Sequence, residues 1–149
     1  MLFYLLALAI FLVDQFIKQL VHSTMFFGQS IPVLDGLIRL TYVRNTGAAF
    51  SLFLGFSPYL AIIGIAAVLA IIYFHFKIPK KDYYMHIALA CVLGGSLGNV
   101  FDRIVRSYVV DYVDFRVWPV FNFADMMINL GMILIIIRLF QEEKKCIQS

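Results

Sequence analysis

Three aspartates stand close together in the stretch VVDYVDFRVWPVFNFAD, residues 109–125. They are Asp111, Asp114 and Asp125, and the last of them lies inside an apolar run. Two carboxyl groups a few ångströms apart cannot both ionise, so one keeps its proton while the other acts as a base. Such a pair can activate water for attack on a peptide carbonyl and protonate the leaving amine. The residue types predict a pair of Asp125 with either Asp111 or Asp114, and spacing does not choose between these two.

The chain around these acids is strongly apolar. Of its 149 residues, 62% are hydrophobic and only 14% are charged, and the mean hydropathy is +0.90. Soluble domains usually carry about 25% charged residues. Four apolar runs approach the length of about 20 residues that a helix needs to cross a bilayer; they are 2–20, 59–76, 83–105 and 120–140. Too few polar faces remain to cover them as core helices of a soluble protein, so the sequence predicts an all-α multi-pass membrane protein.

Polar residues lie near those ends of the runs that would meet at one face of the membrane, because successive helices alternate in direction. They are Asp14 and Lys18 in the first run, Asn99, Asp102 and Arg103 in the third, and Asn122 and Asp125 in the fourth. An ionisable residue inside a bilayer costs about 2.5–3.5 kcal/mol, so this cluster needs an explanation. Structural ion pairs are one reading, Asp14 with Lys18 and Asp102 with a neighbouring arginine. These pairs leave Asp111 and Asp125 unexplained.

The segment 21–58 does not read as a fifth membrane span. Asp35-Gly36 between apolar runs is a strong hairpin signal, which predicts a small β-sheet at the membrane surface between the first and second helices. Several phenylalanines there suit an interfacial aromatic belt, namely Phe26, Phe27, Phe50, Phe53 and Phe56. A plain anchoring loop is the alternative, although the polar interruption Asn45-Thr46-Gly47 would then have no reason.

The distribution of positive charge bears on orientation. The short link 77–82 carries three lysines, and the opposite side carries Arg39, Arg44, Arg106 and Arg116. The positive-inside rule therefore comes close to a tie, and it favours cytoplasmic termini because the lysines cluster in the shortest loop. The first run lacks the basic flank of a cleaved signal peptide, so we expect it to be a retained helix.

Other chemistries have weaker support in the sequence. Gly94–Gly98 matches G-x-S-x-G, but a nucleophile elbow needs a strand-turn-helix context and a histidine partner, and Ser96 lies inside a predicted helix. These glycines fit close helix packing better. No His, Cys and carboxylate residues have the spacing of metal ligands, so we expect no metal and no cofactor. A small proton-coupled transporter that uses Asp14 is the alternative from another class, although no internal repeat is visible.

Five sequence blocks, in this order, resemble the lipoprotein signal peptidase (signal peptidase II) family of bacterial inner-membrane aspartic proteases. They are Asp14-Gln15 with Lys18, VRNTGAAFS at 43–51, GGSLGNVFDR at 94–103, VVDYVDF at 109–115 and FNFAD at 121–125. The resemblance runs nearly end to end and implies one integral membrane domain over residues 1–149. It also implies four transmembrane helices, a small extracytoplasmic sheet called the β-cradle, a short surface helix, and an active site near the outer leaflet.

By this resemblance, Asp111 and Asp125 form the catalytic dyad. The supporting or substrate-binding positions are Asn45, Asn99, Asp102, Arg103 and Asn122, and the structural pair is Asp14 with Lys18. The implied reaction is cleavage of a diacylglyceryl-modified prolipoprotein on the amino side of its lipidated cysteine. We expect a monomer in membrane lipid that binds no nucleic acid.

Two features depart from the family pattern. The two aspartates are only 14 residues apart, which shortens the outer connector, so we expect a rudimentary surface helix. Met126 stands where the family often has a small polar residue, which bears on the support of Asp125.

Overall fold

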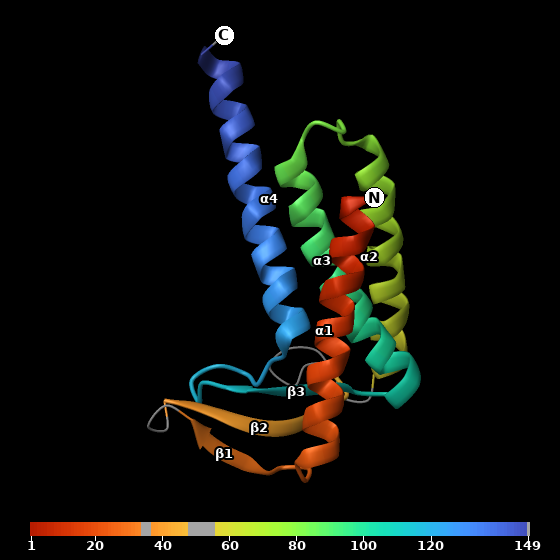
Figure 1. Ribbon diagram of the computed structural model, residues 1–149, viewed down its shortest axis with the longest axis vertical. Helices are drawn as coiled ribbons and strands as arrows, with labels where there is room; N and C mark the ends of the chain where they lie inside the picture. The colour runs from red at the N-terminus through yellow and green to blue at the C-terminus, as the bar shows by residue number, and fades with distance from the viewer. Residues whose placement is uncertain (34–36, 48–55, 149) are drawn as a thin grey trace.

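Four long helices stand side by side in the computed structural model, which describes residues 1–33, 37–47 and 56–148 (Figure 1). Within these residues the helices are α1 (Leu2–Thr24), α2 (Ser57–Lys77), α3 (Tyr83–Arg106) and α4 (Phe123–Gln148). Each is long and apolar enough to cross a membrane. The predicted multi-pass helical fold is therefore confirmed.

The ends of the helices differ from the predicted spans by a few residues. The first helix continues to Thr24, beyond the predicted end at Leu20. The fourth begins at Phe123 and not at Val120, so Asn122 precedes the helix. Asp125 consequently lies in the first turn of α4, whereas the sequence analysis treated it as a residue inside the fourth span.

A small antiparallel sheet covers one end of the helices (Figure 1). Its strands are β1 (Ser30–Val33), β2 (Ile38–Asn45) and β3 (Val109–Asp114), in the spatial order β1-β2-β3. Val33 pairs with Ile38, which confirms a hairpin around Asp35-Gly36, although residues 34–36 lie outside the described part of the chain. The predicted sheet between the first two helices is thus confirmed, and it contains one further strand.

The sequence predicts only a connector between α3 and α4, where the structure has the third strand. Val109–Asp114 pairs with β2, where Asp111 lies opposite Val43 and Val109 opposite Asn45, and pairing between segments so far apart in the chain leaves no local signal. After this strand, residues 115–122 contain no helix. The short surface helix implied by the resemblance is therefore absent from this connector, and residues 48–55 lie outside the described part of the chain.

Three of the five phenylalanines assigned to an interfacial belt are exposed on the structure. Phe26, Phe27 and Phe56 have 84%, 65% and 50% of their surface accessible. The other two, Phe50 and Phe53, lie outside the described residues. The exposed rings lie in or beside the sheet end of the chain, as an interfacial belt requires.

Helix α3 packs against each of the other three helices. Glycines on α3 allow this packing because they have no Cβ, so the backbones of neighbouring helices can approach closely. The missing Cβ of Gly94 would meet the backbone oxygen of Ala7 on α1, and that of Gly95 would meet the backbone oxygen of Ala124 on α4. The predicted role of these glycines in close helix packing is confirmed.

Both termini lie at the end of the bundle opposite the sheet, and so does the link between α2 and α3 (Figure 1). The C-terminal ends of α1 and α3 and the N-terminal end of α4 therefore meet at the sheet. The buried polar residues of the described chain gather at this end: Asp14, Lys18, Ser57, Asn99, Asp102, Asp111 and Asn122.

Replacing Gly95 with alanine should loosen the contact between α3 and α4. The added Cβ would collide with the backbone of Ala124 and the side chain of Ile128, and overpacking of this kind costs about 1–3 kcal/mol. We expect a lower midpoint of thermal denaturation in detergent, followed by circular dichroism. The neighbouring, half-buried Ser96 gives a matched control, Ser96→Ala, which should keep the wild-type midpoint. An unchanged midpoint for Gly95→Ala would contradict this account of the packing.

Candidate active site

Asp111 is a buried carboxyl group on the central part of β3, with 2% of its surface accessible. Its Oδ1 accepts a hydrogen bond from Nδ2 of Asn122 (2.6 Å), and its Oδ2 accepts one from Nδ2 of Asn45 (2.9 Å). Asn45 reaches it from the neighbouring strand β2, just beyond a shift in register. Both oxygens of this carboxyl group are thus held by neutral amides.

Asp125 is held at the N-terminus of α4 by a reciprocal pair of hydrogen bonds. The backbone nitrogen of Asn122 donates to Oδ2 of Asp125 (3.2 Å), and the backbone nitrogen of Asp125 donates to Oδ1 of Asn122 (3.0 Å). This is the geometry of a capping box. The second oxygen of Asp125 accepts from Nδ2 of Asn99 (2.7 Å). The unusual Met126 is 46% exposed, and the hydrogen bonds that hold Asp125 do not involve it.

One asparagine links the two acids. Asn122 contacts Asp111 through its side-chain nitrogen, and it contacts Asp125 through its side-chain oxygen and its backbone nitrogen. Burial and then the nearby Asp125 raise the pKa of Asp111 to about 7, against the smaller opposing effect of the amide hydrogen bonds. Asp111 therefore holds a proton up to neutral pH, beside a second carboxyl group.

A buried ion cluster lies behind this pair. Nζ of Lys18 is 2.9 Å from Oδ2 of Asp14 and 3.2 Å from Oδ2 of Asp102, and all three side chains are fully buried. The same nitrogen donates to Oδ1 of Asn99 (2.9 Å). Lys18 thus meets three oxygens, one from its own helix and two from α3.

Lys18 determines the orientation of the side-chain amide of Asn99. An ammonium group can only donate hydrogen bonds, so the side-chain oxygen of Asn99 must face Lys18. That oxygen also accepts from Nδ2 of Asn122 (3.2 Å). The side-chain nitrogen of Asn99 then points to Asp125, to which it donates.

The two carboxylates of the cluster also hold the backbone on either side of the site. Oδ1 of Asp14 accepts from the backbone nitrogen of Ala124 (3.0 Å), and Oδ2 of Asp102 accepts from that of Val110 (3.1 Å). Ala124 and Val110 each directly precede one of the two acids of the pair. The predicted ion pairs are confirmed, and they form a single cluster that positions β3 and the start of α4.

Gln15 and Arg106 complete this cluster. Arg106 forms an ion pair with Oδ1 of Asp102. Nε2 of Gln15 donates to the side chains of Asp14 and Asp102 and to the backbone oxygen of Gly98, at 3.1, 3.3 and 3.2 Å. A Cβ at Gly98 would overlap the carboxylate of Asp14, so the glycine is needed for α1 and α3 to share these charges.

Arg103 connects α3 to the polar interruption after β2. Its guanidinium donates to the backbone oxygens of Asn99 (3.3 Å) and Gly47 (3.1 Å), and the backbone nitrogen of Gly47 donates to Oδ1 of Asn45 (2.9 Å). This turns Nδ2 of Asn45 toward Asp111, which explains the interruption at Asn45-Thr46-Gly47. Nε of Arg103 is buried with no hydrogen-bond partner among the described residues.

Asp114, the other carboxyl group left open by the sequence, lies apart from this group. Its Oδ2 accepts from the hydroxyl of Thr41 (2.8 Å), and its Oδ1 accepts from the backbone nitrogen of Arg116 (2.7 Å). The hydrogen bonds from these two residues lower the pKa of Asp114, the backbone bond more than the hydroxyl. Asp114 is thus an ionised residue that stabilises the sheet.

The serine–histidine alternative has no geometric support in the described chain. The ring of His22 contacts the hydroxyl of Tyr42 (2.7 Å). His75 contacts His86, at the opposite end of the bundle. Ser96 therefore lacks the histidine that a nucleophile needs.

Tyr112 is a positioning residue that the sequence analysis missed. Its hydroxyl accepts a hydrogen bond from the backbone nitrogen of Phe123 (3.1 Å), so it ties β3 directly to the first residue of α4. A tyrosine between two aspartates does not by itself predict this contact. The sequence could have suggested it only if β3 had been recognised as a strand.

The structure places the candidate residues in three groups. The hydrogen-bonded centre contains Asn45, Asn99, Asp111, Asn122 and Asp125; the ion cluster behind it contains Asp14, Lys18 and Asp102; and Arg103 lies at the edge. Groups of three or more side chains able to hold a metal ion do not occur among the described residues.

The fold and this site define a multi-pass membrane protein with two carboxyl groups linked at one end of its helices. A family model described as signal peptidase (SPase) II matches residues 6–141. The chain belongs to the signal peptidase II family, and it is accordingly a transmembrane protease of the hydrolase class.

Individual relatives agree with this assignment over most of their length. Lipoprotein signal peptidase of Fusobacterium nucleatum is 41% identical over 149 residues, covering 97% of this chain and 90% of the relative. That of Bacillus velezensis is 42% identical over 151 residues, covering 97% and 98%. A solved bacterial membrane enzyme superposes with a TM-score of 0.90 at 33% identity, covering 96% of this chain and 90% of that enzyme. The four-helix architecture with its small sheet is thus shared with known membrane enzymes.

Replacing Lys18 with methionine should destabilise the fold strongly. The change leaves Asp14 and Asp102 buried without the lysine between them, and breaking a buried ion pair costs about 3–5 kcal/mol. We expect a lower free energy of unfolding in detergent. Lys77→Met, at an exposed lysine of α2, should have little effect. Adding Asp14→Asn to Lys18→Met should recover part of the loss, and failure to do so would contradict the charge-based account.

The raised pKa of Asp111 predicts a pH-dependent stability. Its unfolded-state value is 3.8, against about 7 in the fold, so between these values the folded state binds more protons than the unfolded state. The wild type should therefore lose stability as the pH rises through this window. Asp111→Asn cannot ionise, so its melting midpoint relative to wild type should rise between about pH 5.5 and about pH 8.

Asp114→Asn is the control for this measurement. Because the pKa of Asp114 is lowered, that group stays ionised across the same window, and its variant should differ from wild type by a constant amount. A constant difference for Asp111→Asn as well would contradict the raised pKa.

Proposed function

We propose that this protein cleaves the signal peptide from diacylglyceryl-modified prolipoproteins, on the amino side of the lipidated cysteine, with Asp111 and Asp125 as an aspartic dyad. Membership of the signal peptidase II family supports the cleavage of lipoprotein signal peptides. The observation that carries the dyad is the contact of Asn122 with both acids. The relatives named lipoprotein signal peptidase support the prolipoprotein substrate.

The proposed reaction uses one proton shared by the two carboxyl groups. The ionised member takes a proton from water, and the oxygen attacks the carbonyl carbon of the scissile peptide bond. The protonated member then gives its proton to the amide nitrogen as the C–N bond breaks. The pair ends with the proton on the opposite member, and no covalent intermediate, metal or cofactor is required.

The neighbouring groups suit this reaction because they keep the pair in place without neutralising it. Asn45, Asn99 and Asn122 donate neutral hydrogen bonds to the two carboxyl groups. A lysine or arginine in direct contact would hold both acids ionised, whereas amides leave a proton to be shared. Nε of Arg103, beside Asn99, is buried and has no hydrogen-bond partner among the described residues, which supports a further role in holding the substrate backbone.

We infer that the whole chain, residues 1–149, acts as one membrane domain and as a monomer in lipid. We also infer that the termini lie in the cytoplasm and that the active site lies near the outer leaflet of the bacterial inner membrane. Support comes from the lysines of the α2–α3 link, which lie at the same end as the termini, together with the positive-inside rule. The sheet and the two acids are at the other end.

The transporter alternative is less favoured by the same geometry. Asp14, which such a transporter would use, is bound to Lys18 and to the backbone of Ala124. The buried polar residues of the described chain occupy only the sheet end, whereas a transport path needs polar access from both sides.

A cleavage assay tests the proposed dyad. Purified protein in detergent would receive a lipidated prolipoprotein and, separately, the same substrate without its lipid. We expect cleavage of the lipidated form, and a loss of rate of about 10²–10⁴-fold or more in Asp111→Asn and in Asp125→Asn.

Asp114→Asn is the matched control, since it removes a carboxylate of the same strand that binds Thr41 and the backbone of Arg116 and lies apart from the pair. It should cleave at a rate near that of wild type. Substantial activity in either dyad variant that is folded by circular dichroism would rule out the pair. A folded but inactive Asp114→Asn would show that the wrong carboxyl group had been chosen.

A further inference from the structure

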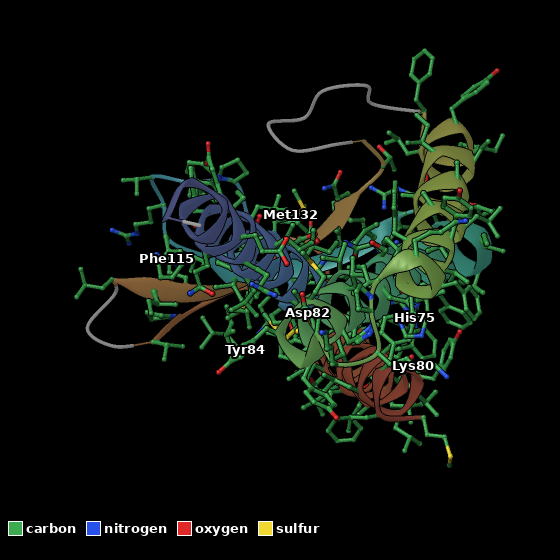
Figure 2. All side chains as sticks on the ribbon, turned by 90° about the horizontal axis from the view of Figure 1, so that it is seen from above. His75, Lys80, Asp82, Tyr84, Phe115 and Met132 are labelled. Carbon is green, nitrogen blue, oxygen red and sulfur yellow. The ribbon has the colours of Figure 1, made fainter. Side chains whose placement is uncertain are left out.

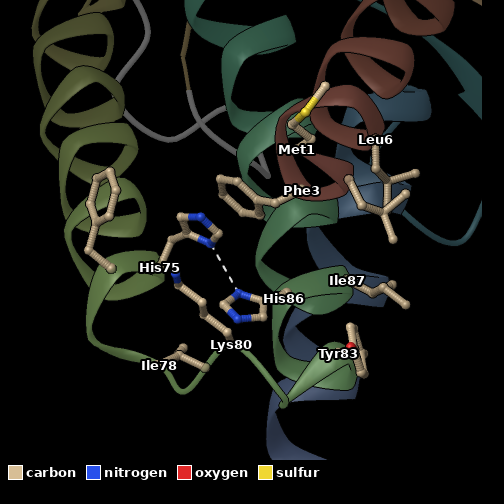
Figure 3. A pocket seen from close by; sticks show the side chains of 11 residues that line it. Met1, Phe3, Leu6, His75, Ile78, Lys80, Tyr83, His86 and Ile87 are labelled. Atoms are coloured by element: carbon tan, nitrogen blue, oxygen red, sulfur yellow. Dashed lines mark hydrogen bonds between the residues drawn. The ribbon is translucent and has the colours of Figure 1, made fainter.

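A second candidate site lies at the end of the bundle opposite the dyad. A cavity of about 430 Å³ opens between the N-terminal end of α1, the C-terminal end of α2 and the start of α3. Its lining is apolar on the α1 side, with Leu2, Phe3 and Leu6, and it carries His75, Lys80 and His86 on the α2–α3 side (Figure 3). Neither the proposed catalytic mechanism nor the ion cluster uses any of these residues.

The two histidines form an ordered pair on the wall of this cavity. Nδ1 of His75 is 3.0 Å from Nδ1 of His86, and Nε2 of His86 is 3.2 Å from the backbone oxygen of Pro79 (Figure 3). A carbonyl oxygen only accepts, so Nε2 of His86 carries a proton, and in the neutral tautomer that this assigns Nδ1 of His86 is an acceptor. His75 therefore donates through Nδ1, which leaves its own Nε2 as a hydrogen-bond acceptor.

The ring of His75 is held in place on its other side by an aromatic contact. Phe3 stacks on it, with the ring centroids 3.7 Å apart and the planes 10° from parallel. His75 is thus fixed between Phe3 and His86. Because its ring is held on two sides, His75 can offer a fixed polar contact to a ligand in the cavity.

The charge around the cavity is positive. The last residue of α2 is Lys77, and the link to α3 carries Lys80 and Lys81 and a single acid, Asp82. Oδ2 of Asp82 forms an ion pair with Nη2 of Arg138 on α4, at 2.9 Å. Seen from this end of the bundle, His75 and Lys80 lie together on one side, and Asp82 is set off from them (Figure 2). Among the described residues, Lys80 therefore forms no ion pair with an acid.

The rim of the cavity is exposed and apolar. Leu2 and Tyr83 on its rim are 64% and 67% exposed, and both belong to helices that span the membrane. The cavity lies at the ends of these helices, at the level where lipid head groups lie. A ligand with a negative head and apolar chains would match both the lysine and the apolar lining of this cavity.

We propose that this cavity binds an anionic phospholipid, with the phosphate at Lys80 and the polar head group against His75. The apolar side chains of α1 would contact the start of the acyl chains. Basic pockets between transmembrane helices recognise anionic head groups in this way. A zwitterionic lipid would bring its own ammonium group next to Lys80 and is disfavoured.

Native mass spectrometry of the full chain in detergent tests this site. The protein would be titrated with phosphatidylglycerol, whose head group brings a phosphate and hydroxyl donors, and separately with phosphatidylcholine and inorganic phosphate. We expect preferential binding of phosphatidylglycerol. Lys80→Gln should weaken it about fivefold, the contribution of one lysine near an anionic membrane surface.

Lys81→Gln is the matched control, because it removes the same charge at the next position, which does not line the cavity. It should change the affinity less than twofold. Ile87→Trp, which fills the cavity from α3 without changing charge, should abolish binding while leaving peptide cleavage and the circular dichroism spectrum unchanged.

Three outcomes would overturn the proposal. Equal binding of phosphatidylcholine would remove the role of charge. Equal effects of Lys80→Gln and Lys81→Gln would mean attraction to the surface in general. Displacement of the lipid by millimolar inorganic phosphate would mean a site for free phosphate and not for a lipid.

Discussion

Lys18 lies without exposed surface between the carboxylates of Asp14 and Asp102 and the amide oxygen of Asn99. Removing three charges from water is costly, and well-packed apolar residues would often be at least as stable. What apolar residues could not do is hold backbone groups. The two carboxylates bind the residues that precede Asp111 and Asp125, and the lysine turns Asn99 toward the second of them. The ion cluster is therefore best understood as the frame that sets the distance between two acids.

This frame exists only because helix α3 approaches its neighbours so closely. Gly94, Gly95 and Gly98 leave room for the backbones of α1 and α4 and for the carboxylate of Asp14. A larger side chain at Gly98 would occupy the place of that carboxylate. Close packing and buried charge therefore depend on each other, because the glycines let the helices bring together the oxygens that bind Lys18.

The two ends of the helix bundle carry polar residues of different kinds. At the sheet end, neutral amides surround the carboxyl groups of Asp111 and Asp125, and the buried charge of Lys18 lies behind them. At the other end, Lys80 and a histidine pair line a largely apolar cavity, and the nearby Asp82 is paired with Arg138. The first environment suits the chemistry of a proton, and the second suits the recognition of a fixed negative charge.

The sequence by itself determined the four spans, the hairpin, the glycine packing and the ion pairs, because hydropathy, turn chemistry and helical spacing are local properties. The resemblance of five blocks added the family, which the comparisons bear out. Only the tertiary structure decided that Val109–Asp114 is a strand and that Asp125 lies in the first turn of α4. The same holds for the separation of Asp111, which meets Asn45 and Asn122, from Asp114, which meets Thr41. These features depend on pairing between segments far apart in the chain. The three-residue spacing of Asp111 and Asp114 does not predict which segment each side chain contacts.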